Sequence, residues 1–385
     1  MRIVWRTTPG TAKLFLSGLL SLTLLVTAAA HSEEWLYTVR PGDNLWTVST
    51  DYLIRTDYWP RLQALNGVAD PARLPPGMKL RIPVPWLKRL PAKARVLSAQ
   101  GQVNAAIAAT GQTVPVNAGL LLQTGDTLLT GSDSTASLEF RDGSRVLLQA
   151  DSELRMDVLS AYGPTRLADT RIRLQQGRVE SQITSRTGAG PRYEISTPAA
   201  TSAVRGTRYR IGMDPASATA RTEVLEGAVA FRGGQTTRTV NRGFGTLAET
   251  GRAPLPPSLL LPPPKLAESP PVVMRLPVQL GFFPLKGAVA YRAQIVPADP
   301  FKALLLDTVL PALESENRGA VEVLTLLLSP VGSALPAGDY VARIRGIDDR
   351  GLEGRDAQYR FRFHALPGQD PEEDESRYTL ANADF

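Results

Sequence analysis

The chain has 385 residues, 43% of them hydrophobic and 21% charged, and is therefore long enough for several domains that each bury a core. It contains no cysteine and only two histidines, which excludes disulfides, thiol nucleophiles and thiolate metal sites and leaves carboxylates as the main catalytic candidates. The formal charge of +6 is too small to indicate nucleic-acid binding, and we expect no nucleic-acid partner, no cofactor and no metal.

Residues 1–30 have the pattern of a secretory signal peptide. Basic residues between Arg2 and Lys13 precede an apolar run, Leu14 to Val26, that is shorter than a membrane span, and Ala28-Ala29-Ala30 offers small residues for cleavage. We therefore expect a cleaved signal, a periplasmic location and no stable membrane insertion afterwards. An uncleaved membrane anchor is the alternative.

Residues 36–85 predict a strand, two helices and a second strand. Pro41 and Gly42 break the first strand, and Asp43 is expected to be the N-cap of a helix that begins near Asn44. Asp57 is expected to cap the second helix, and Gly67 to end it in a left-handed conformation. The stretch "MKLRIPV", residues 78–84, then returns as a strand.

The stretches "YTVRPGDNLWTVSTDY" and "WPRLQALNGVADPARLPPGMKLRIPV" resemble a LysM module. The resemblance implies a βααβ fold that binds glycans containing N-acetylglucosamine, such as peptidoglycan and chitin. It also implies a shallow groove between two loops, where glycine permits close approach of the backbone and peptide groups meet the N-acetyl group. Carried over by position, the glycan-binding residues are Gly42, Asp43, Asn44, Leu45, Asn66, Gly67, Val68, Asp70, Ala72, Arg73 and Leu74.

This sequence departs from the family pattern at two of these positions. Asn44 stands where serine or threonine is commoner, and Ala72 replaces a residue that is usually polar. The alternative interpretation of the turn is that Asp43 only caps a helix and the groove binds nothing.

An all-β domain is predicted at residues 96–250, after a linker at 86–95. Short alternating segments are separated by glycine and aspartate, and Arg141-Asp142-Gly143 is expected to be a hairpin turn. The stretches "GDTLLTGSDSTASLEFRDGSRVLLQADSELRM", "YEISTPAATSAVRGTRYRI" and "TEVLEGAVAF" resemble a FecR-type domain, an extracytoplasmic module of bacterial iron-signalling regulators and of other envelope proteins.

The remaining chain divides into three predicted regions. Residues 251–271 are a proline-rich, extended linker, and residues 272–366 resemble a fibronectin type III or immunoglobulin-like β-sandwich. Residues 367–385 form an acidic tail that we expect to be disordered. The predicted fold class is therefore multidomain and mainly β, with an N-terminal βααβ module, a central all-β domain and a C-terminal sandwich.

The function predicted from these regions is non-catalytic binding of peptidoglycan in the periplasm. The β domains would serve as a docking surface for another envelope protein. One alternative is an extracytoplasmic FecR-like sensor of an envelope signalling pathway. A wall hydrolase is a second alternative, but we find no spaced catalytic pair in the sequence.

Overall fold

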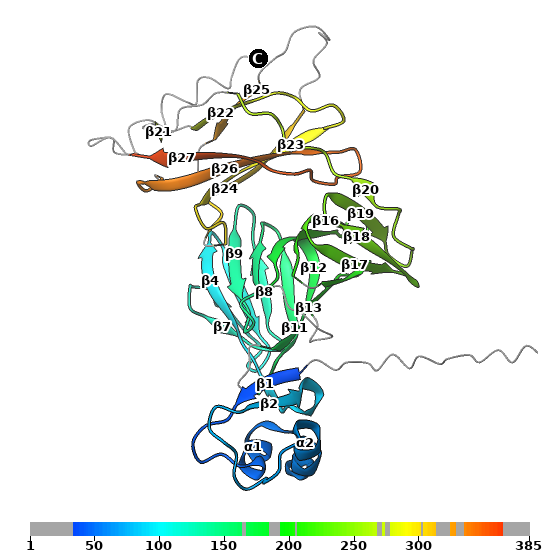
Figure 1. The fold of residues 1–385 in the computed structure, drawn as a ribbon. Coiled ribbons are helices and arrows are strands. Elements are labelled where there is room, and N and C mark those ends of the chain that lie inside the picture. The colour runs from blue at the N-terminus through cyan, green and yellow to red at the C-terminus, as the bar shows by residue number, and fades with distance from the viewer. Residues whose placement is uncertain are drawn as a thin grey trace, which may run out of the picture. The chain divides into compact units, whose positions relative to one another are not determined.

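The structure, a computed structural model, describes residues 34–163, 167–184, 193–204, 206–267, 272–273, 278–301, 303–312, 324–328 and 335–364. The predicted signal peptide and acidic tail lie outside these residues. The described secondary structure is mainly β, with an N-terminal βααβ region and several further sheets, as predicted (Figure 1).

The N-terminal region is a two-stranded antiparallel sheet with two helices. Apolar side chains from both helices and both strands, including Leu45, Leu62 and Leu80, form its buried core. Gly67 ends the second helix with φ +60°, which confirms its predicted left-handed conformation. The elements are β1 (Glu34–Thr38), α1 (Leu45–Tyr52), the 3-10 helix η1 (Thr56–Tyr58), α2 (Trp59–Asn66) and β2 (Lys79–Pro83).

Both predicted helix caps are wrong. Asn44, not Asp43, is the N-cap of α1: its Oδ1 accepts from the N–H of Thr47 at 2.8 Å, and the Thr47 hydroxyl accepts from the N–H of Asn44 at 3.1 Å. In the second helix, Asp57 is paired with Arg55 at 2.6 Å and lies inside η1, one residue before the N-cap of α2. A short 3-10 turn therefore displaces the start of α2 beyond the reach of that carboxylate.

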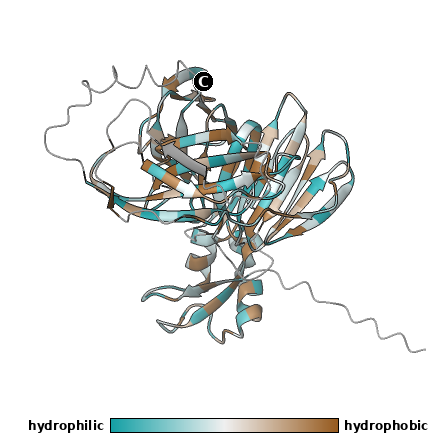
Figure 2. Ribbon diagram, turned by 90° about the horizontal axis from the view of Figure 1, so that it is seen from above, coloured by the Kyte–Doolittle hydropathy of each residue, from teal (hydrophilic) through white to brown (hydrophobic). Residues whose placement is uncertain are grey.

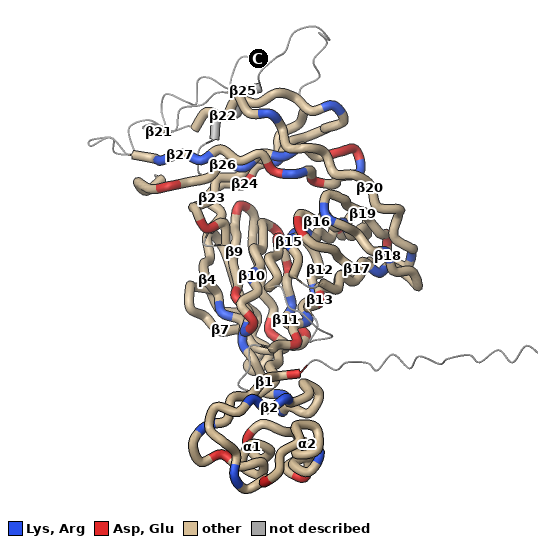
Figure 3. The backbone as a smooth tube through the Cα atoms, in the orientation of Figure 1, with Lys and Arg blue, Asp and Glu red and all other residues tan. Residues whose placement is uncertain are grey.

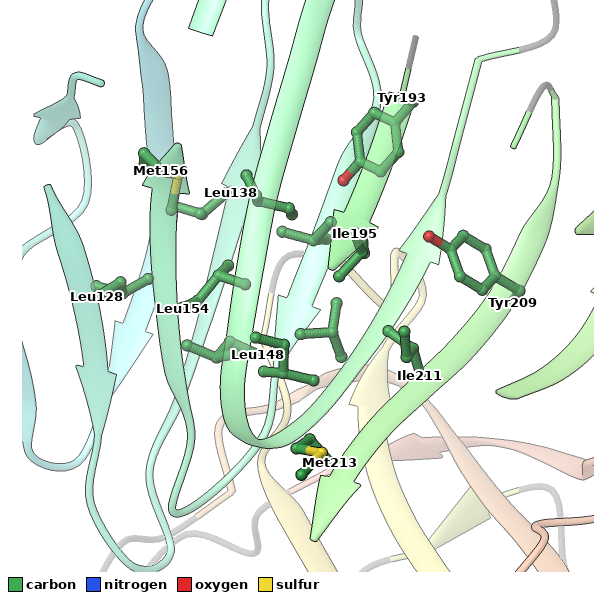
Figure 4. Close-up of a cluster of buried hydrophobic side chains, with 14 of the residues drawn as sticks. Leu128, Leu138, Leu148, Leu154, Met156, Tyr193, Ile195, Tyr209, Ile211 and Met213 are labelled. Carbon is green, nitrogen blue, oxygen red and sulfur yellow. The ribbon is translucent and has the colours of Figure 1, made fainter. Parts of the chain in front are cut away.

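The central region is built from two sheets that share the long strand β12. Buried side chains from both sheets form one core, part of which is shown in Figure 4. Gly143, with φ +83°, lies in the turn between β9 and β10, as predicted. The strands are β4 (Ala94–Gln100), β5 (Val103–Ile107), β6 (Gln112–Pro115), β7 (Leu121–Leu122), β8 (Thr127–Thr130), β9 (Thr135–Glu139), β10 (Arg145–Leu148), β11 (Glu153–Tyr162), β12 (Ala168–Gln182), β13 (Tyr193–Ser196), β14 (Thr201–Val204), β15 (Arg208–Asp214), β16 (Thr219–Glu226), β17 (Ala228–Gly233), β18 (Thr236–Asn241) and β19 (Phe244–Glu249). We call this region, whose two sheets meet at β12, the barrel.

The two predicted linkers are parts of the folded structure. Residues 86–95 contain the end of the 3-10 helix η2 (Val84–Trp86) and all of β3 (Arg89–Pro91), which pairs with β11. The proline-rich segment is extended, yet its β20 (Ser258–Leu259) pairs with β19, and the Leu261 carbonyl accepts from the N–H of Arg355 at 2.9 Å. Both segments are therefore held by backbone hydrogen bonds to the regions that they join.

The described strands of the C-terminal region form a five-stranded sheet in the order β21-β27-β26-β23-β24 and a two-stranded sheet of β22 and β25. One face of the larger sheet packs with β22 in a core that includes Phe282, Tyr291 and Ile344. The strands are β21 (Val272–Val273), β22 (Val278–Phe282), β23 (Ala290–Pro297), β24 (Leu306–Pro311), β25 (Leu324–Leu328), β26 (Gly338–Ile347) and β27 (Ala357–Phe363).

The other face of the larger C-terminal sheet is charged and also buried. Hydropathy alternates along its strands (Figure 2), so that Arg292 and Gln294 on β23 and Arg343 and Arg345 on β26 lie opposite the apolar face. Charged residues lie along the strands of both regions (Figure 3). Arg343 pairs with Glu180 of β12, which is buried in the barrel, and Arg210 of β15 pairs with Asp356 of the C-terminal region. The barrel and the C-terminal sheet therefore share a buried polar interface.

Candidate functional site

The two loops of the predicted groove are joined by a backbone hydrogen bond. The N–H of Leu45, the first residue of α1, donates to the carbonyl of Pro71 at 2.9 Å. The second loop is held in a turn by Asp70. The Asp70 Oδ1 accepts from the N–H of Ala72 at 2.9 Å, and the Asp70 backbone carbonyl accepts from the N–H of Arg73 at 3.3 Å. The start of α1 and the loop after α2 thus form one continuous surface.

Three backbone N–H groups in the two loops are unpaired within the described chain. Among the described residues, none accepts a hydrogen bond from the backbone N–H of Gly42, Ala69 or Leu74. Gly42 has φ +90°, a conformation that favours glycine, and the position where a Cβ would lie is open space. Unpaired amides next to an open backbone are groups that can bond to the carbonyl of an acetamide.

Three of the apolar residues predicted for the groove have buried side chains. Leu45, Val68 and Leu74 are at most 8% exposed and belong to the core of the module. Their contribution to a ligand is therefore limited to backbone groups and to the shape of the loops. Gly42, Gly67, Asp70, Ala72 and Arg73 are exposed, as a binding surface requires.

The polar side chains predicted for the groove mostly hold the loops in place. Asn44 caps α1, and Asp43 accepts from the Tyr37 hydroxyl at 2.6 Å and from the N–H of Arg40 at 2.7 Å. Asn66 bonds to the backbone of Arg81 in β2: its Oδ1 accepts at 2.6 Å and its Nδ2 donates at 3.0 Å. Sequence reasoning identified these residues but not their structural roles.

An aromatic cluster beside the first loop was missed by the sequence analysis. The ring centroids of Trp35, Tyr37 and Tyr52 lie 5.2 to 5.3 Å apart. Burial, together with the hydrogen bond to Asp43, raises the pKa of the Tyr37 hydroxyl, which keeps it a donor. The spacing of Trp35 and Tyr37 on one face of a strand was the signal that could have revealed it.

The described residues contain no group of three or more histidine, aspartate or glutamate side chains placed to hold a metal ion. In the same part of the chain, no helix is both long and apolar enough to cross a membrane.

Similarity to solved structures is weak. Two structures of a proposed anti-sigma factor from Parabacteroides distasonis show 11% and 10% identity and TM-scores of 0.30 and 0.29, over 34% of this chain and 59% of theirs. A fungal alcohol oxidase in complex with copper shows 12% identity and a TM-score of 0.22, over 67% of this chain and 58% of the oxidase. The chain thus spans less than two thirds of each, and none of these similarities supports an argument. A search of curated proteins gave no match.

Family models match two regions of the chain. The LysM domain matches residues 37–83, and the FecR protein family matches residues 126–230. LysM domains bind glycans that contain N-acetylglucosamine, such as peptidoglycan, and both are binding or regulatory domains of extracytoplasmic type. The C-terminal region lies outside both matches, so its fibronectin type III or immunoglobulin-like character stays a prediction. The chain therefore contains a LysM domain and a FecR domain.

Proposed function

We propose that this protein is a non-catalytic periplasmic protein that binds peptidoglycan through the groove of its LysM domain. The observation that carries the proposal is the pair of loops held together by Leu45 and Pro71. The backbone N–H groups of Gly42, Ala69 and Leu74 in these loops have no partner within the described part of the chain. These groups would bond to the N-acetyl group of the sugar, and the exposed Ala72 and Gly67 would lie against the ring.

Such a groove is expected to bind weakly on its own. A shallow site with a few peptide hydrogen bonds typically has a Kd in the micromolar to millimolar range, or about −8 to −4 kcal/mol. Lasting attachment to the wall would then require a second contact on the same polymer or on a neighbouring protein.

The barrel and the C-terminal region would provide that second contact as a docking surface. Their shared interface contains buried ion pairs such as Glu180 with Arg343 and Arg210 with Asp356. A docking surface that spans both regions would therefore keep its shape when the protein binds another envelope component.

Sedimentation with insoluble peptidoglycan tests the groove. We compare the wild type with Ala72→Trp, which places an indole in the second loop, and with Ala64→Trp, which changes another exposed alanine, on α2 outside the groove. The proposal predicts that only Ala72→Trp lowers the bound fraction. Equal retention of all three proteins would show that the groove does not bind peptidoglycan.

The FecR match favours a second candidate, an extracytoplasmic sensor that reports the state of the envelope to a membrane partner. A sensor predicts that deletion changes the transcripts of an envelope-stress regulon before cell shape or permeability changes. A peptidoglycan-binding scaffold predicts the reverse order.

A further inference from the structure

The two edges of the LysM sheet differ. On β2, the outward N–H and C=O of Arg81 are both bonded to the side-chain amide of Asn66, which takes the place of a neighbouring strand. On β1, the residue opposite Arg81 is Leu36, and β1 pairs with no strand other than β2 among the described residues. The edge of β2 is thus closed at this position, whereas the edge of β1 is open.

The register fixes which groups of β1 face outward. Val39 turns its N–H and C=O toward the β2 side, because they bond to Met78 and Gly77 at 2.9 and 2.8 Å. Backbone groups alternate along a strand, so the N–H and C=O of Thr38 and Leu36 face away from β2. The backbone N–H of Arg81, the residue paired with Leu36, also points away from the neighbouring strand, which agrees with this assignment. Among the described residues, the outward N–H and C=O groups of Leu36 and Thr38 therefore have no partner.

A hollow of about 550 Å³ runs along this open edge. Leu36 is 61% exposed beside it, and Arg40 is the one charged residue among the described residues that line it. Within the described chain, the Arg40 guanidinium has no ion pair or hydrogen bond, and Lys79 lies close by with its Nζ bonded to the Thr38 hydroxyl at 2.5 Å. The full lining is Trp35, Leu36, Tyr37, Thr38, Val39, Arg40, Pro41, Tyr52, Pro76 and Gly77.

The hollow adjoins both loops of the proposed glycan groove. Pro41 directly precedes Gly42 in the first loop, and Pro76 lies two residues after Leu74 in the second. A substituent on a sugar bound between the loops can therefore extend along β1.

We propose that the open edge of β1 binds the acidic peptide carried by the glycan strands of peptidoglycan. This inference rests on the proposed function and names which glycan the domain prefers. Peptide groups of the ligand would bond to the outward backbone groups of Leu36 and Thr38. The Arg40 guanidinium would pair with a peptide carboxylate, and the apolar lining would cover aliphatic side chains. Chitin carries no peptide, so these contacts would select peptidoglycan over chitin.

The test is calorimetric titration of the full-length protein with three ligands. They are a muropeptide, the same sugar chain after removal of its peptide, and a chitin oligomer of equal length. The variants are Thr38→Pro, which removes the outward N–H, and Thr38→Val, which keeps it. Arg40→Gln removes the cation at the hollow, and Arg61→Gln removes an exposed cation on α2.

We expect the wild type to bind the muropeptide more tightly than the other two ligands. Thr38→Pro and Arg40→Gln should each weaken muropeptide binding about three- to tenfold, the usual effect of losing one hydrogen bond, and should leave peptide-free sugar binding unchanged. The two control variants should behave as the wild type does. Unchanged binding of the peptide-free sugar also shows that each variant is folded.

The results distinguish failure of the peptide site from failure of the glycan groove. If the wild type binds all three ligands equally, or if Arg40→Gln binds the muropeptide as the wild type does, the peptide site is overturned and the glycan groove stands. If no ligand binds the wild type, the proposed function fails and the peptide site fails with it.

Discussion

The carboxylate of Glu180 on β12 lies 3.2 Å from the guanidinium Nη1 of Arg343 on β26, and both side chains are 1% exposed. Glu180 also pairs with Arg208 at 2.7 Å, within the barrel. This contact therefore joins two regions that are 163 residues apart through charges removed from water. The same interface contains the pairs of Arg345 with Glu353 and with Asp356.

Removing the charge of Glu180 should strongly destabilise the protein. Glu180→Gln leaves Arg343 and Arg208 without their shared carboxylate, and breaking a buried pair in this way costs about 3–5 kcal/mol. Urea unfolding of the full chain measures the loss. The control is Glu34→Gln, which breaks an exposed pair with Arg81 that should be worth at most about 1 kcal/mol. Equal effects of the two substitutions would contradict the buried network.

Acid should weaken the interface between the barrel and the C-terminal sheet. Burial alone would raise the pKa of the Glu180, Glu353 and Asp356 carboxyls, but the surrounding arginines outweigh burial and lower each pKa below its ordinary value. These carboxylates therefore stabilise the fold above the ordinary carboxyl pKa of about 4, and this stabilisation is lost as the pH falls through their lower folded-state pKa.

The urea midpoint should accordingly change little between about pH 7 and pH 5 and fall below about pH 4. Glu180→Gln should show a smaller fall than the wild type, because one of the titrating carboxylates is absent. A wild-type midpoint that rises on acidification would contradict this assignment.

The sequence predicts the C-terminal strands but not the role of their polar face. Hydropathy alternates in β23 and β26, with Tyr291 and Ile344 in the core and Arg292 and Arg343 on the other face. An arginine-rich face is ordinarily exposed to solvent. That it is buried here depends on partners far away in the sequence, such as Glu180, which pairs with Arg343. Local periodicity contains no information about such a partner.

Gly177 on β12 should tolerate no side chain. It has φ +88°, and a Cβ would lie 2.0 Å from the Ser152 hydroxyl oxygen. Gly177→Ala should therefore lower the free energy of unfolding in two ways. The steric conflict costs about 1–3 kcal/mol, and the left-handed conformation of alanine costs about 1–2 kcal/mol. Gly243 has φ +83° with open space around it, so Gly243→Ala should show the conformational cost alone. Urea unfolding of both variants checks this, and equal destabilisation would show that the contact is unimportant.

Asn44 should be needed to begin α1. Asn44→Ala removes the hydrogen bond to the N–H of Thr47 and should cost about 1 kcal/mol, whereas Asn44→Asp should retain most of the stability. Hydrogen exchange of the Thr47 amide provides the measurement. Rapid exchange in the alanine variant alone is expected, and unchanged exchange in that variant would contradict the assignment of the cap.

The position of the LysM domain was predictable from the sequence, and the family match at residues 37–83 confirms it. The roles of the residues in its two loops were not predictable in the same way. The sequence does not tell whether a polar side chain faces a ligand or its own backbone. Asn66 fits both roles by residue type, and only its hydrogen bonds to Arg81 show that it closes a sheet edge.

The most direct test of glycan binding in the groove is an NMR titration of the protein with N-acetylglucosamine oligomers, in which the backbone amide shifts are followed. The account predicts shifts of the Gly42, Ala69 and Leu74 amides, which have no partner among the described residues, and little change at Ala64 on α2. Saturable shifts confined to these two loops would support glycan binding in the groove. Unmoved loop amides at millimolar ligand would contradict it.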